Sequence, residues 1–137
     1  MIVLVDTSVW SLALRRRPEH LSGSQPNLTQ VLAELIREGR AQIIGPIRQE
    51  LLSGIREQVQ FTNVRDYLRA FRQPSLEAAD YEEAASMNHQ CRVRGITGSA
   101  IDFLICAVAH RRGWLIFTTD RDFQHYATVL PLRLFSA

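Results

Sequence analysis

"IVLVDTSVW", residues 2–10, joins a short apolar run directly to an aspartate, and "LIFTTDRDF", residues 115–123, repeats the arrangement. In the second stretch, two aspartates follow the apolar run within five residues. Short apolar runs without polar alternation are typical of central strands in a parallel sheet, which are buried on both faces. The two stretches therefore predict two buried strands with carboxylates at their carboxyl ends.

The remaining chain alternates helical and extended patterns. Helices are predicted from Asp6, over 28–36, from Pro46, up to Phe71, over 75–94, over 99–112 and over 121–126; further strands are predicted over 41–44 and 130–135. Gly39, Gly95 and Gly113 follow three of these helices, as glycine often does at a helix C-terminus. Strands alternating with helices predict an α/β domain with a mostly parallel sheet.

Length and composition predict a globular protein. The 137 residues suffice for one domain with its own core, and 46% of them are hydrophobic. No apolar stretch reaches the length of a membrane helix, and Met1–Val5 is too short for a signal peptide. Cys91 and Cys106 fall in predicted helices, so we expect buried free thiols, which suit a reducing cytoplasm.

All 16 basic residues are arginine, and the net charge is only +2. The simplest explanation of the missing lysine is genomic base composition, but its absence excludes a phosphate-binding Walker loop. The sequence has no Gly-x-Ser-x-Gly nucleophile motif, no His-Glu-x-x-His zinc motif and no histidines at metal-ligand spacing. An aspartyl-phosphate enzyme is disfavoured as well, because Ser8 stands where one such family needs a second aspartate.

Acidic residues from four segments are predicted to meet at one edge of the sheet, where ligands bind in such folds. Asp6 and Asp120 follow the first and third strands, and Glu50 lies in the first turns after the second strand. Asp102 opens the helix that leads into the third strand, so an antiparallel helix returns it to the same edge. Asp122 is a fifth candidate.

Each acid also has a purely structural explanation. Helix capping could account for Asp6, Asp102 and Asp120, a helix dipole for Asp122, and a solvated helix position for Glu50. Together, however, clustered carboxylates repel one another unless a cation compensates their charge. Oxygen ligands favour Mg²⁺ or Mn²⁺ over zinc, and such ions serve phosphodiester hydrolysis.

The rest of the chain suits a polyanionic substrate. Without the four principal acids, 16 arginines face ten remaining acidic residues, which leaves a formal charge of +6. Arg15, Arg16 and Arg17 are candidate phosphate contacts, although a solvated loop explains them equally well.

The stretches "IVLVDTSVW", "QELLSG", "GSAIDFLICAVAHRRGWLIFTTDRDF" and "LPLRLF" resemble the PIN-domain family. More closely, they resemble VapC-type ribonuclease toxins of bacterial type II toxin–antitoxin pairs, in order and over nearly the whole chain. The resemblance implies a single domain over residues 1–137, a three-layer sandwich with a central sheet of four to five strands. It also implies metal binding by Asp6, Glu50, Asp102 and either Asp120 or Asp122.

The resemblance further implies supporting hydrogen bonds, or else helix capping, from Thr7, Ser8 and Thr118. It implies a cytoplasmic Mg²⁺- or Mn²⁺-dependent endoribonuclease in which metal-bound water is the nucleophile. A homodimer and a toxin–antitoxin hetero-oligomer with a DNA-binding, VapB-like antitoxin are the expected assemblies. Two alternatives stay open, namely a non-toxin PIN nuclease of RNA processing and an inactive PIN fold that acts as a binding module.

Partner contacts are expected on the two helices between Pro46 and Phe71, unless these apolar residues line the core. The candidates are Leu51, Leu52, Ile55, Phe61, Val64 and Leu68.

Overall fold

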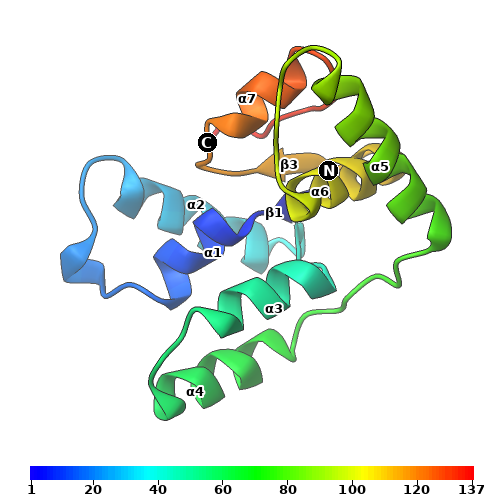
Figure 1. The fold of residues 1–137 in the computed structure, drawn as a ribbon. Helices are drawn as coiled ribbons and strands as arrows, with labels where there is room; N and C mark the ends of the chain where they lie inside the picture. Colours follow the sequence, from blue (N-terminus) through cyan, green and yellow to red (C-terminus); the bar gives the residue numbers. More distant parts are fainter.

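A parallel three-stranded sheet lies at the centre of the computed structural model, which describes residues 1–137 (Figure 1). The strands are β1 (Val3–Val5), β2 (Ala41–Gln42) and β3 (Leu115–Phe117), in the order β2-β1-β3. Val3 pairs with Ala41 on one side and with Leu115 on the other. All of β1 is buried, as its uninterrupted apolar sequence predicts.

The prediction of four to five strands is wrong, because the segment 130–135 does not form a strand. This segment runs beside β3 and makes one parallel bridge, between Ile116 and Leu134. The Ile116 N–H donates to the carbonyl of Arg133, and the Phe135 N–H donates to the carbonyl of Ile116. Pro131 has no N–H, and the N–H of Leu132 donates to the carbonyl of Leu130, so neither residue donates to a ladder with β3.

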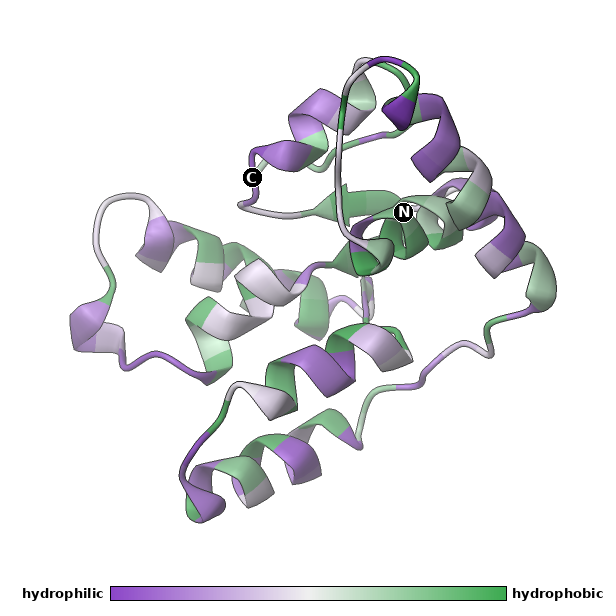
Figure 2. Cartoon of the chain, viewed as in Figure 1, coloured by the Kyte–Doolittle hydropathy of each residue, from purple (hydrophilic) through white to green (hydrophobic).

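Helices flank the sheet, and in Figure 2 the ribbon of β3 is hydrophobic, whereas helices such as α3 and α4 alternate hydrophilic and hydrophobic residues. They are α1 (Thr7–Leu14), α2 (Gln25–Arg37), α3 (Gly45–Ser53), α4 (Gln58–Leu68), α5 (Ala78–Arg92), α6 (Ala100–Arg112) and α7 (Asp122–Ala127), with a 3₁₀ turn at Pro18–His20. The most buried is α6, in which every residue from Phe103 to Ala109 is inaccessible or nearly so. It ends at Gly113, whose φ of 71° is costly for other residues.

One continuous core of 29 buried residues links the sheet to the helices. Cys91 and Cys106 lie in it as free thiols, which confirms that prediction. Leu51, Val64 and Leu68 lie in it too, so for these three the alternative holds and they line the core. None of the helices combines the length and hydrophobicity needed to cross a bilayer.

Candidate metal centre

The carboxyl ends of β1 and β3 are joined through the side chain of Asp6. Its Oδ2 accepts hydrogen bonds of 2.8 Å from Ser8 Oγ and of 2.8 Å from Thr118 Oγ1. The same two hydroxyls accept backbone N–H groups, Ser8 from Thr119 and Thr118 from Asp120. Ser8 and Thr118 therefore orient Asp6 and tie it to the backbone that carries Asp120.

Asp6 occupies the N-cap position of α1, yet its side chain caps nothing. The residue is 7% exposed, and its carboxylate accepts hydrogen bonds from the hydroxyls of Ser8 and Thr118. The capping explanation of this aspartate therefore fails.

Asp102 lies in the first turn of α6, where its backbone N–H and its carboxylate have different hydrogen-bond partners. Its N–H donates to Ser99 Oγ, so Ser99 caps the helix. Its Oδ2 accepts a hydrogen bond of 2.6 Å from the hydroxyl of Tyr126 in α7. The carboxylate accepts no hydrogen bond from the Ser99 backbone N–H, so the second half of a capping box is missing and capping does not account for the acidic side chain.

Asp102, Asp120 and Asp122 form one acidic group, in which one oxygen from each lies within 4.8 Å of the others. The antiparallel return of α6 thus brings Asp102 to the end of β3. Asp120 Oδ1 also accepts the N–H of Asp122 at 2.9 Å, so Asp120 additionally supports the start of α7.

Burial raises the pKa of Asp102, and the negative charges of Asp120 and Asp6 raise it further. The hydrogen bonds from Tyr126 and Ser99 oppose this shift. The three aspartates are therefore close enough for their charges to repel. No arginine forms an ion pair with any of them or with Asp122.

Glu50 lies apart from this group. It is an exposed residue of α3 and lines a groove that the first turns of α6, including Ala100, also line. Thr7 is buried, and its Oγ1 is the one buried side-chain oxygen or nitrogen without a hydrogen-bond partner.

The three arginines that follow α1 separate in the structure. Arg15 and Arg16 line a polar pocket together with Arg56, while Arg17 does not. Arg15 donates to the carbonyl of Gly54, where an added Cβ would collide with the guanidinium. The arginine pocket thus combines the end of α1 with the loop after α3.

The residues at the sheet edge fit a divalent cation. The donors are carboxylate oxygens only, which suits Mg²⁺ or Mn²⁺ rather than zinc. Their negative charge has no internal counterion. The hydroxyls of Ser8 and Thr118 orient the Asp6 carboxylate, as hydrogen-bonding groups around metal sites orient the metal ligands of other proteins.

Comparison with known proteins identifies the fold. A model of the PIN domain family matches residues 3–129. The chain belongs to the PIN-domain family. The predicted family membership is thereby confirmed.

Solved structures of similar fold support the PIN assignment. FitAcB from Neisseria gonorrhoeae is 18% identical, with a TM-score of 0.74, and 98% of this chain and 97% of that chain are covered. DNA-bound VapBC from Salmonella typhimurium is 14% identical, with a TM-score of 0.75 and coverage of 98% and 97%. A toxin–antitoxin complex from Klebsiella pneumoniae is 18% identical, with a TM-score of 0.66 and coverage of 88% and 89%. A comparison with curated protein sequences finds no match.

The sequence did not predict the role of Tyr126. Its spacing from Phe123 indicates only the buried face of a short helix, and 24 residues separate it from Asp102. The one feature of the sequence that indicates this contact is a tyrosine on a buried helix face, because a buried hydroxyl needs a hydrogen-bond partner.

Proposed function

We propose that this PIN domain is a Mg²⁺- or Mn²⁺-dependent endoribonuclease and the toxin of a type II toxin–antitoxin pair, acting in the cytoplasm. The observation that carries the proposal is the acidic group of Asp102, Asp120 and Asp122 beside Asp6, which no arginine neutralises. PIN domains are generally nucleases. The toxin assignment is supported by the similarity in fold to VapBC and to a toxin–antitoxin complex.

Asp6, Asp102 and Asp120 would hold the metal, with Asp122 or Glu50 completing the set. A divalent cation bound there supplies activation of the attacking water and stabilisation of the leaving oxygen during phosphodiester hydrolysis. Ser8 and Thr118 keep one oxygen of Asp6 in place, which reduces the reorganisation needed when the cation binds.

The RNA backbone would approach along α1. The eight residues of this helix separate Asp6 from Arg15, a rise of about 13 Å. The arginine pocket of Arg15, Arg16 and Arg56 would then bind a phosphate a few nucleotides from the cleavage site, since guanidinium groups match phosphate geometry.

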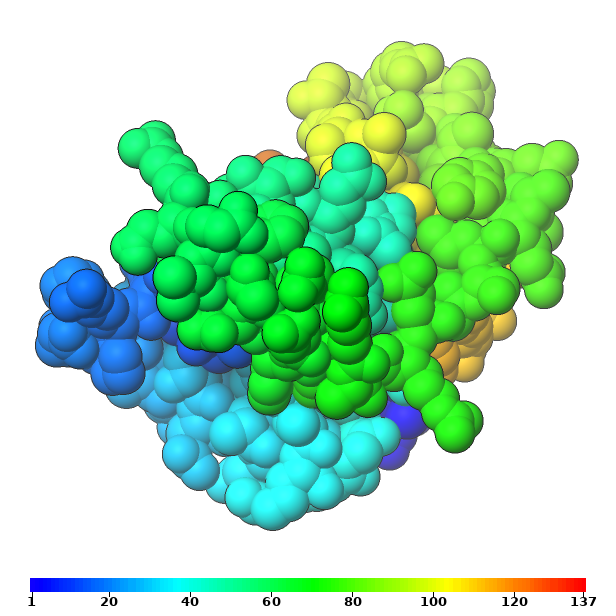
Figure 3. Space-filling model, turned by 90° about the horizontal axis from the view of Figure 1, so that it is seen from below, coloured from blue at the N-terminus to red at the C-terminus, as the bar shows by residue number.

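The antitoxin would cover the groove between α3, α5 and α6. This groove has a volume of about 580 Å³ and a predominantly apolar lining, with Glu50 on one wall and Tyr81 on the other. Figure 3 views the molecule from the side of α3, α4 and α5. An extended or helical antitoxin segment with apolar side chains would fit such a groove and obstruct access past Glu50. A toxin homodimer within a larger hetero-oligomer is part of the proposal.

Incubation with total cellular RNA tests the proposed function. Purified protein is compared with the Asp6→Ala variant, each with Mg²⁺ and with EDTA. We expect discrete cleavage that requires both the metal and Asp6. Cleavage by the variant at the wild-type rate contradicts the proposal. Absence of cleavage by folded, antitoxin-free protein favours the binding-module alternative, and growth arrest upon expression without a partner distinguishes a toxin from a nuclease of RNA processing.

A further inference from the structure

Tyr126 is a fully buried residue whose hydroxyl reaches the acidic group. Its ring packs against Phe103 and Phe123, with centroids 5.0 Å and 5.2 Å away. These contacts fix the ring, and the hydroxyl donates to Asp102 Oδ2 at 2.6 Å. We propose that Tyr126 is a positioning residue for the metal centre, which holds one oxygen of Asp102 and leaves the other for the cation.

The chemistry of the contact separates positioning from packing. A phenylalanine would fill the same space, make the same ring contacts and avoid burying a hydroxyl. The hydroxyl hydrogen has a single acceptor, Asp102, so its orientation is determined by that carboxylate. A carboxylate with Oδ2 engaged in this way cannot rotate freely, and it offers Oδ1 in a fixed direction.

Gly98 makes room for this arrangement. A Cβ placed on Gly98 would collide with the Tyr126 hydroxyl and approach the ring carbons Cζ and Cε1 to 2.8 Å and 2.9 Å. The collision involves a ring that Phe103 and Phe123 hold in place, so it is costly to relieve. Gly98 therefore leaves the space that the hydroxyl of Tyr126 occupies, and any larger residue at position 98 should displace this hydroxyl from Asp102.

The expected consequence is a change in metal affinity. Groups that orient a metal ligand typically contribute 10–100-fold in metal affinity or activity when they are removed. This inference rests on the proposed function, because it assumes that Asp102 is a metal ligand.

The test measures binding of Mn²⁺ alone, without RNA, by calorimetry and by electron paramagnetic resonance of the free ion. For Tyr126→Phe we expect the Kd for Mn²⁺ to rise about 10–100-fold, while far-ultraviolet circular dichroism stays that of the wild type. Tyr67→Phe is the matched control, because Tyr67 is 42% exposed and its hydroxyl has no partner. Its Kd should equal that of the wild type.

Gly98→Ala supplies a second, independent variant that keeps the tyrosine. It should weaken Mn²⁺ binding. In the Tyr126→Phe background the same change should weaken binding by a smaller factor than it does alone, because the hydrogen bond is already gone and only the contact with the ring carbons remains. Wild-type affinity in either single variant overturns the inference and leaves the proposed function standing. Absence of Mn²⁺ binding by the wild type overturns both.

Discussion

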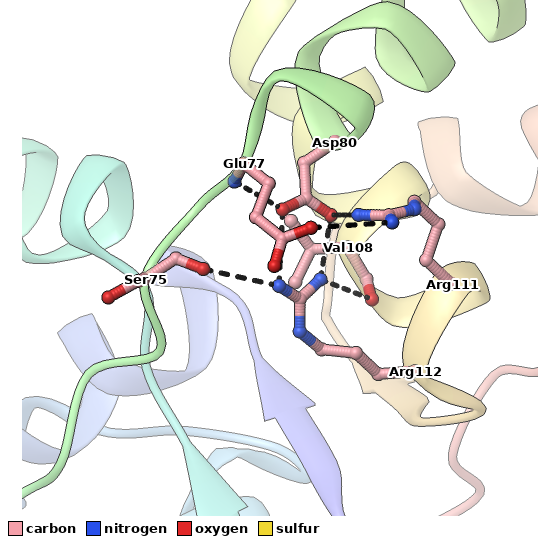
Figure 4. A network of polar contacts seen from close by, with 6 residues as sticks. All are labelled: Ser75, Glu77, Asp80, Val108, Arg111 and Arg112. Carbon is pink, nitrogen blue, oxygen red and sulfur yellow. Dashed lines mark hydrogen bonds and ion pairs between the residues drawn. The ribbon is translucent and has the colours of Figure 1, made fainter.

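Each end of α6 contributes to a cluster of charged residues, and the two clusters are built in opposite ways. At its N-terminus, Asp102 lies beside other carboxylates and meets no arginine. At its C-terminus, Arg111 and Arg112 converge on the buried Asp80 of α5, at 2.6 Å and 2.7 Å (Figure 4). Asp80 also closes a capping box with Glu77, and Arg112 extends to the carbonyls of Ser75 and Val108.

The pKa values of the two acids shift in opposite directions for this reason. Hydrogen bonding to Arg112 lowers the pKa of Asp80, whereas burial and neighbouring carboxylates raise the pKa of Asp102. A chain with 16 arginines that places two on Asp80 and none on Asp102 retains negative charge at the sheet edge. The cluster at Asp80 has its counter-charge within the chain, whereas the cluster at Asp102 has none.

The largest expected effect is on the rate of RNA cleavage, which should depend on the cluster at Asp102 and not on the cluster at Asp80. Asp102→Asn should lower the rate of RNA cleavage about 1,000-fold or more, because metal binding contributes several kcal/mol of transition-state stabilisation. Single-turnover cleavage at saturating Mg²⁺ measures the loss. Asp66→Asn is the control, since Asp66 is an exposed residue of α4. Equal cleavage rates for Asp102→Asn and Asp66→Asn would show that the cluster at Asp102 has no part in catalysis.

The next largest effect is on the free energy of unfolding, which should depend on the cluster at Asp80. Asp80→Asn leaves two arginines without their counter-charge, and breaking a buried pair costs about 3–5 kcal/mol. The lower end applies because Arg111 and Arg112 are 31% and 21% exposed and can reach water. Urea denaturation should show a loss of about 3 kcal/mol, with the cleavage rate per folded molecule unchanged. An unchanged unfolding free energy would show that Asp80 is not the stabilising cluster.

Magnesium should stabilise only through the acidic edge. At a Mg²⁺ concentration 100 times the Kd, the folded wild type should gain about 2.7 kcal/mol, as for any ligand of the native state alone. Asp102→Asn should lose most of this gain, whereas Asp80→Asn should retain it in full. Denaturation with Mg²⁺ and with EDTA measures both, and an equal gain in the two variants would place the ion elsewhere.

The edge acids could be predicted from the sequence because parallel strands impose the geometry. Two apolar runs that end in aspartates predict two strands, and the antiparallel return of α6 predicts that Asp102 lies at the end of β3. The family was recognisable for the same reason, because its motifs surround these strand ends.

Contacts between side chains of distant segments could not be predicted in this way. Asp80 lies at an acidic helix start, which indicates a favourable dipole, but nothing local shows that Arg112 turns back onto it. The hydroxyl of Tyr126 is equally hidden, since aromatic spacing reports burial and not direction. The number of strands was overestimated because the apolar run 130–135 lies beside β3 without forming a ladder.

The smallest expected effect is a pair of opposite pH dependences in metal-free protein. The folded pKa of Asp80 is depressed, so its stabilisation is complete above the unfolded value of about 3.9 and is lost as the pH falls further. The folded pKa of Asp102 is raised, so its ionisation destabilises the fold at neutral pH, and protonation removes this penalty as the pH falls towards about 4.

In EDTA at pH 7, Asp102→Asn should therefore be more stable than the wild type by up to about 1 kcal/mol. The gain should disappear by about pH 4, just where the deficit of Asp80→Asn begins to shrink. Urea denaturation of both variants between about pH 3 and about pH 7 measures the two stability curves. A deficit for Asp102→Asn at neutral pH would mean that this carboxylate is compensated within the protein, as Asp80 is, and that the acidic edge does not depend on a cation.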